Sequence, residues 1–151
     1  MELSVTRDRH GRGMRGPFVP QATPRYRTRS QKFDAAVLDA YAPLAARFQQ
    51  QLHNLDVAVD TVPRMRLSAD TTVLPDEIVA DGPVPLGRVI PAGVDRRGRP
   101  TRPRIVIFRK PIEQRYVSVS ERTEILKTVL TALVANHLNI DPLDIDPDFQ
   151  W

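Results

Sequence analysis

Residues 118–139 restrict the possible folds of this 151-residue chain more than any other part of its sequence. Ser118 and Glu121 have the spacing of a capping box, in which the two side chains accept backbone N–H groups at the start of a helix. Apolar side chains then recur every three or four residues, and Asn139 stands where a left-handed residue commonly ends a helix. The sequence therefore predicts a long C-terminal helix with a buried face formed by Leu126, Val129, Leu130, Leu133, Val134, His137 and Leu138.

A second amphipathic pattern predicts a long helix near the N-terminus. Ser30 is a suitable N-cap residue, and Pro43 is expected to kink the helix. The spacing of three and four residues between apolar positions keeps one side of this helix buried. Those positions are Phe33, Val37, Tyr41, Leu44, Phe48 and Leu52.

The segments between the two helices contain strand patterns. Residues 57–62 alternate apolar and polar side chains before Pro63, as in a strand at a sheet edge. Residues 84–91 and 104–110 are expected to be antiparallel neighbours, the second of them central and covered on both faces. Residues 64–83 are expected to form a connecting loop. The predicted fold class is α+β, with a long N-terminal helix, a short and mostly antiparallel sheet, and a C-terminal helix.

The composition, and the positions of glycine and proline, indicate how the chain is organised. With 41% hydrophobic residues, the chain suits one core with tails. Because residues 1–29 are rich in glycine and proline, we expect them to form an arm, with a short strand at residues 3–6. We expect residues 30–142 to form the domain and residues 143–151 to form an acidic tail.

The sequence contains no apolar run of about 18 residues and no apolar segment behind its first arginines, so we expect no membrane contact and a cytoplasmic protein. Cysteine is absent, which excludes disulfides and thiolate chemistry.

Three sequence motifs together resemble a known family. They are VPLGRVIP, RIVIFRKPIE, and a helix followed by the turn Asn139-Ile140-Asp141. Over residues 30–142 the chain resembles the small bacterial zincin-like metallopeptidases, or minimal zincins, in an actinobacterial branch that has lost the HExxH motif. The resemblance implies a small zincin-like domain whose last helix is the former active-site helix.

The same resemblance implies that the catalytic residues are missing. It places Ala132 and Asn136 at the two histidine positions and Leu133 at the catalytic glutamate, and leaves Asp141 as the only possible surviving ligand. A zincin requires both imidazoles and the glutamate to hold zinc and activate water. We therefore expect no cofactor and no catalysis, and interpret the chain as a non-catalytic module that binds a protein or peptide, with the strand at residues 104–110 as a possible edge for an extended peptide. The alternative is a zinc peptidase with unusual ligands, for which His10, His53 and His137 are the available imidazoles.

Clustered arginines support a different class of function. Seven lie in the arm, and a second cluster lies in the Gly- and Pro-containing stretch 95–104. Such basic segments bind the phosphates of RNA or DNA without sequence preference, so association with nucleic acid or the ribosome is the other alternative. A solubilising arm, or one that folds onto the acidic C-terminal tail, is also compatible with this pattern. The candidate contact residues are Arg7, Arg9, Arg12, Arg15, Arg25, Arg27, Arg29, Arg96, Arg97 and Arg99.

Overall fold

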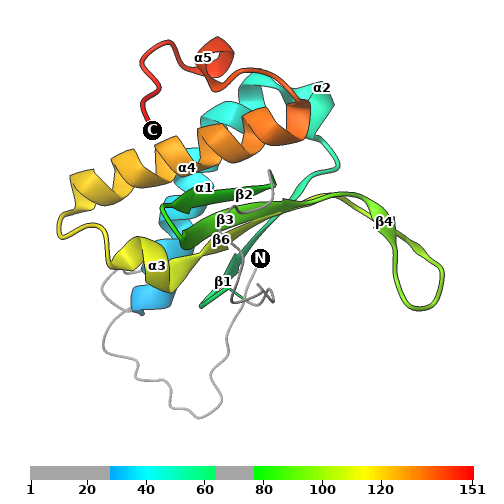
Figure 1. Cartoon of the computed structure of the whole chain (residues 1–151), viewed down its shortest axis with the longest axis horizontal. Coiled ribbons are helices and arrows are strands. Elements are labelled where there is room, and N and C mark those ends of the chain that lie inside the picture. Colours follow the sequence, from blue (N-terminus) through cyan, green and yellow to red (C-terminus); the bar gives the residue numbers. More distant parts are fainter. Residues whose placement is uncertain (1–27, 64–76) are drawn as a thin grey trace, which may run out of the picture. The chain divides into compact units, whose positions relative to one another are not determined.

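A mixed four-stranded sheet with two long helices on one face forms the centre of the fold (Figure 1). The computed structural model describes residues 28–63 and 77–151, and residues 33–151 belong to one compact unit. The helices are α1 (Arg29–Arg47), α2 (Gln49–Leu52), α3 (Arg109–Glu113), α4 (Val119–Leu138) and α5 (Pro142–Ile145). The strands are β1 (Asp56–Asp60), β2 (Ile78–Asp81), β3 (Val84–Ile90), β4 (Gly93–Val94), β5 (Pro100–Thr101) and β6 (Arg104–Phe108). The predicted α+β class is confirmed.

The sheet has the strand order β1-β6-β3-β2. Strand β3 runs antiparallel to both β6 and β2, as expected for residues 84–91 and 104–110, whereas β1 runs parallel to β6. Four consecutive residues of β6, from Ile105 to Phe108, are buried, which confirms a strand covered on both faces. Because β6 is paired on both sides, the expectation that it offers a free edge to a peptide is wrong. Among the described strands, β1 and β2 form the two edges of the sheet.

Several boundaries differ from the sequence expectations. The strand expected to reach Lys110 ends at Phe108, because Arg109 begins α3, and Pro111 lies within its first turn, where a missing N–H costs little. Strand β2 lies in the segment expected to be a loop. The other expected loop residues, 64–76, and the expected strand at residues 3–6 lie outside the described residues.

The helix termini follow local capping chemistry. Helix α4 has the predicted capping box at Ser118 and Glu121, and Asn139 has a left-handed φ of 59° at its C-terminus. The expectation that Ser30 caps α1 is wrong, because α1 begins at Arg29 and Ser30 lies in its first turn. There, Thr28 Oγ1 accepts the Gln31 N–H at 3.1 Å, and Gln31 Oε1 accepts the Thr28 N–H at 2.8 Å, a reciprocal pair that serves as the cap. The helix runs through Pro43 to Arg47, and residues 49–52 form the separate α2.

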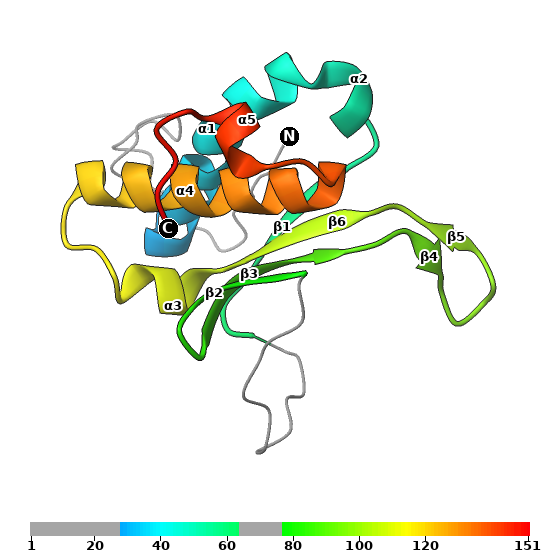
Figure 2. The same ribbon diagram turned by 45° about the horizontal axis from the view of Figure 1, so that its top comes forward.

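The core lies between the sheet and the helices α1 and α4 (Figure 2). Leu133 is fully buried in this core, directly over β3. A Cβ atom placed on Gly87 would stand 2.8 Å from Leu133 Cδ1 and 3.0 Å from the Val106 carbonyl oxygen. Glycine at this position therefore allows α4 to approach the sheet closely. The predicted stripe of α4 is buried through Val134, whereas His137 and Leu138 are only half-buried.

Candidate functional site

The four positions implied by the zincin resemblance differ in exposure and in chemical character. Leu133, at the glutamate position, is 0% exposed, whereas Ala132 is half-buried and Asn136 is exposed. The carboxylate of Asp141 accepts the Leu143 N–H at 2.9 Å and caps α5. An apolar side chain thus occupies the position that would activate water in the family, and the remaining carboxylate has a structural role.

The two histidines that the structure describes, His53 and His137, lie at the ends of two different helices. The His53 ring nitrogen Nδ1 lies 2.7 Å from the Gln50 carbonyl oxygen at the end of α2, and His137 lies in the last turn of α4. His10 falls outside the described residues. Within residues 28–63 and 77–151, no three His, Asp or Glu side chains are grouped so that they could hold a metal ion.

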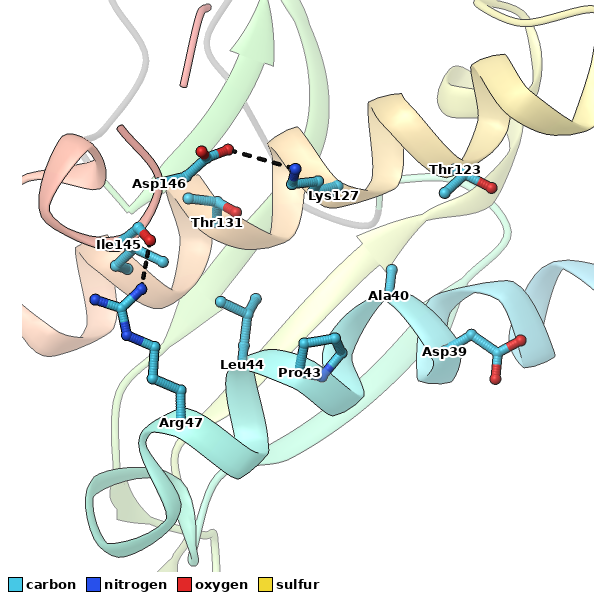
Figure 3. Close-up of a pocket in the computed structure, with 10 residues that line it drawn as sticks. All are labelled: Asp39, Ala40, Pro43, Leu44, Arg47, Thr123, Lys127, Thr131, Ile145 and Asp146. Carbon is cyan, nitrogen blue, oxygen red and sulfur yellow. Dashed lines mark hydrogen bonds and ion pairs between the residues drawn. The ribbon is translucent and has the colours of Figure 1, made fainter. Parts of the chain in front are cut away.

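The structure instead has a cavity of about 410 Å³ bounded by α1, α4 and α5. Its size is in the range of pockets that bind small ligands or large side chains. Figure 3 shows Ala40, Pro43 and Leu44 of α1 facing Thr131 and Lys127 of α4, with Ile145 of α5 closing one end. The lining residues are Asp39, Ala40, Pro43, Leu44, Arg47, Thr123, Lys127, Thr131, Ile145 and Asp146.

Thr131 provides a polar group in this mostly apolar cavity. Its residue surface is 2% exposed, and it is the only polar or charged residue buried to this degree in the part of the chain that the structure describes. A hydroxyl both donates and accepts hydrogen bonds, so a ligand with a matching polar group can bind at this point of the cavity wall.

The segment around α5 occupies one end of the groove between α1 and α4. Ile145 is 6% exposed and belongs to the core. The Arg47 guanidinium donates to the carbonyl oxygens of Ile145 and Asp144, the latter at 3.0 Å, and Lys127 Nζ lies 3.7 Å from Asp146 Oδ2 (Figure 3). The residues that line the cavity therefore bind one short segment through its apolar side chain, two of its backbone carbonyls and its carboxylate.

Two titratable groups of α1 lie outside this cavity. Burial raises the pKa of Tyr41, whose buried hydroxyl has no hydrogen-bond partner among residues 28–63 and 77–151. Burial also raises the pKa of Asp34, and the positive charge of Arg109 opposes this rise. Because neither residue lines the cavity, neither provides it with an acid or a base.

Arg96, Arg97 and Arg99 lie exposed on the turn between β4 and β5. Their guanidinium groups form no ion pair with any described residue. Arg29 is exposed at the first residue of α1, and the remaining arm arginines, from Arg7 to Arg27, lie outside the described residues. Among the described candidates for nucleic-acid contact, three therefore share one turn.

Neither a protein-family model nor a curated protein matches this chain. The resemblance to minimal zincins therefore depends on the sequence motifs alone. Among the described helices, none is both long and apolar enough to span a bilayer.

Sequence reasoning did not identify the cavity. The pattern did contain one indication, because Thr123, Lys127 and Thr131 are spaced by four residues and form a polar row beside the apolar stripe of α4. That row alone is typical of a solvated helix face. The contribution of Arg47 and Ile145 depends on the position of α5, which no local pattern specifies.

Proposed function

We propose that this protein is a non-catalytic peptide-binding module built on a zincin-like scaffold, and that it receives an apolar side chain of its partner in the cavity among α1, α4 and α5. The observation that supports this proposal most directly is that a peptide segment of the chain itself, residues 144–146, already occupies one end of the groove. Arg47 binds its backbone carbonyls, Lys127 faces its carboxylate, and Ile145 is its apolar anchor.

The dimensions and lining of the cavity fit a side chain better than a whole helix. A volume of about 410 Å³ holds one or two large side chains. Ala40, Pro43 and Leu44 offer apolar contact, and the Thr131 hydroxyl offers one directional hydrogen bond at the cavity wall. Peptide-binding grooves commonly combine apolar pockets for alternate side chains with hydrogen bonds to the backbone.

Binding without hydrolysis agrees with the residues at the family positions. Methyl, isobutyl and amide groups at Ala132, Leu133 and Asn136 offer neither imidazole ligands nor a base for water. The retained scaffold thus has a binding role, in the cytoplasmic location expected from the lack of a long apolar segment in the sequence.

A peptide selection tests this proposal. Random peptides displayed on phage are selected on the full chain, and the affinity of synthetic copies is measured by isothermal titration calorimetry. Ala40→Phe fills the cavity from α1, whereas Ala42→Phe adds the same ring at an exposed position that does not line it. We expect the selected peptides to share an apolar residue and to lose roughly tenfold or more in affinity with Ala40→Phe, because an anchor side chain contributes about 1.5–3 kcal/mol.

Two outcomes would overturn the proposal. The first is that selection enriches no peptide above background. The second is that Ala40→Phe and Ala42→Phe bind the selected peptides equally well although both variants unfold at the same denaturant concentration as the unmodified protein.

A further inference from the structure

The β4–β5 hairpin extends the strands β3 and β6 beyond the helices (Figures 1 and 2). Its two short strands pair antiparallel, Gly93 with Thr101 and Val94 with Pro100. Every residue from 91 to 102 is exposed. This two-stranded ribbon contributes no residue to the hydrophobic core, so its side chains are available for a partner.

The turn of the ribbon has a defined shape that depends on Asp95. Its Oδ1 atom accepts the N–H groups of Arg97 at 2.8 Å and Arg99 at 3.0 Å, and its own N–H donates to the Arg99 carbonyl at 2.9 Å. Gly98 has a φ of +77°, which favours glycine. The only carboxylate of the turn thus stabilises the backbone, and the guanidinium groups of Arg96, Arg97 and Arg99 are left without ion pairs among the described residues.

A fourth arginine attaches the base of the ribbon to the body. Arg102 Nε donates to the Asn54 carbonyl at 3.0 Å, and an Nη atom of Arg102 lies 3.4 Å from Asp56 Oδ1. These contacts link the ribbon to the connection between α2 and β1. Arg102 therefore acts as a positioning residue, and the charges at the tip are held away from the body on a supported element.

We propose that the tip of this ribbon, through Arg96, Arg97 and Arg99, binds the phosphate backbone of a nucleic-acid duplex without sequence preference. Guanidinium groups suit phosphates because their planar N–H groups bind two oxygens at once. A two-stranded ribbon is also narrow enough to enter the major groove of B-DNA.

The composition of the ribbon favours a duplex over the other anionic partners. Protein interfaces depend on buried apolar and aromatic residues, and residues 91–104 contain no aromatic side chain and only Val94 and Ala92 as exposed aliphatic ones. Single-stranded nucleic acids are held largely by stacking of bases on aromatic rings. Interfaces with duplex backbone are polar and strongly positive, as this ribbon is.

Fluorescence anisotropy with a labelled random-sequence DNA duplex tests the proposal on the full chain. Arg97→Gln/Arg99→Gln removes two charges from the tip, and Lys32→Gln/Lys110→Gln removes the same charge from exposed positions elsewhere. Each phosphate contact contributes about 0.9 to the slope of log affinity against log salt, so the ribbon variant should lower that slope by about 2. The lysine variant should leave the slope unchanged.

Three results would contradict the proposal: equal effects of the two variants, no salt-dependent binding of the duplex, or binding of single-stranded DNA or of poly-glutamate as tight as that of the duplex. Thermal unfolding of both variants controls for loss of folding. The test is independent of the peptide-binding proposal, because Ala40→Phe should leave DNA binding unchanged and Arg97→Gln/Arg99→Gln should leave peptide binding unchanged.

Discussion

The indole N–H of Trp151 donates a hydrogen bond to the carbonyl oxygen of Ala80 on strand β2, with 3.2 Å between the two heavy atoms. Ala80 lies in one of the two edge strands of the sheet, so the C-terminal residue occupies a backbone acceptor at that edge. Together with Arg47 and Lys127, which hold residues 144–146, this bond attaches the C-terminal segment at two separate points.

Replacing Trp151 by Phe tests this attachment, because it removes the N–H donor and keeps an aromatic ring. The side chain is 60% exposed, so we expect the free energy of unfolding to fall by no more than about 1 kcal/mol. Residues after Asp146 should become more sensitive to proteases. Limited proteolysis followed by mass spectrometry measures this effect, with Gln150→Ala as the control. Unchanged cleavage in Trp151→Phe would show that the hydrogen bond does not hold the segment.

The contact between Gly87 and Leu133 predicts a specific loss of stability. Gly87→Ala places a Cβ atom 2.8 Å from Leu133 Cδ1, and such overpacking costs about 1–3 kcal/mol. Gly93→Ala is the control, because the nearest atom to its Cβ would be Thr101 Oγ1 at 3.9 Å. Urea unfolding of Gly87→Ala, Leu133→Ala and the double variant should give a total loss smaller than the sum of the single losses, because the shortened side chain relieves the clash. Additive losses would contradict this contact.

Restoring the two histidines tests the resemblance to zincins. In Ala132→His/Asn136→His, two imidazoles spaced by four residues would face the same way on α4, close in sequence to Asp141. If the zincin-like geometry is retained, we expect this pair to bind zinc more tightly than Leu38→His/Ala42→His, an equivalent pair on exposed positions of α1. Isothermal titration with zinc measures both affinities. Equal zinc affinities of the two histidine pairs would mean that no third zinc ligand, such as Asp141, lies near the pair on α4.

The capping box of α4 predicts a pH-dependent contribution to stability. The backbone N–H groups of Val117 and Ser118 donate to the Glu121 carboxylate and hold its pKa below its ordinary value. A carboxyl group whose pKa is lowered by folding stabilises the protein above its unfolded pKa, and this contribution is lost as the pH falls through the folded pKa. Glu121→Gln should therefore be less stable than the unmodified protein near neutral pH, and the difference should shrink on acidification. Denaturant unfolding at several pH values measures it, and a difference independent of pH would exclude this mechanism.

Much of the fold was predictable because its signals are local. Helix α4 begins and ends where Ser118, Glu121 and Asn139 indicate, since a cap depends on residues within one turn of the helix end. The antiparallel pairing of β3 and β6 followed from two apolar segments joined by a loop rich in turn residues. Strand β2 was missed because only Ile78 and Val79 favour a strand, whereas Ala80 and Asp81 have weak strand propensity and depend on pairing with β3.

The sequence by itself determined the termini of α4, the α+β class and the clustering of arginines at the β4–β5 turn, because each of these depends on neighbouring residues. Only the tertiary structure decided that Thr131 faces a cavity, that β6 has no free edge, and that Ile145 closes the groove. Arg47 and Ile145 are 98 residues apart in the chain. Such contacts could not be predicted from the sequence because they depend on the packing of whole helices and strands. The cost in chain entropy of bringing distant segments together is offset only when the complete core forms.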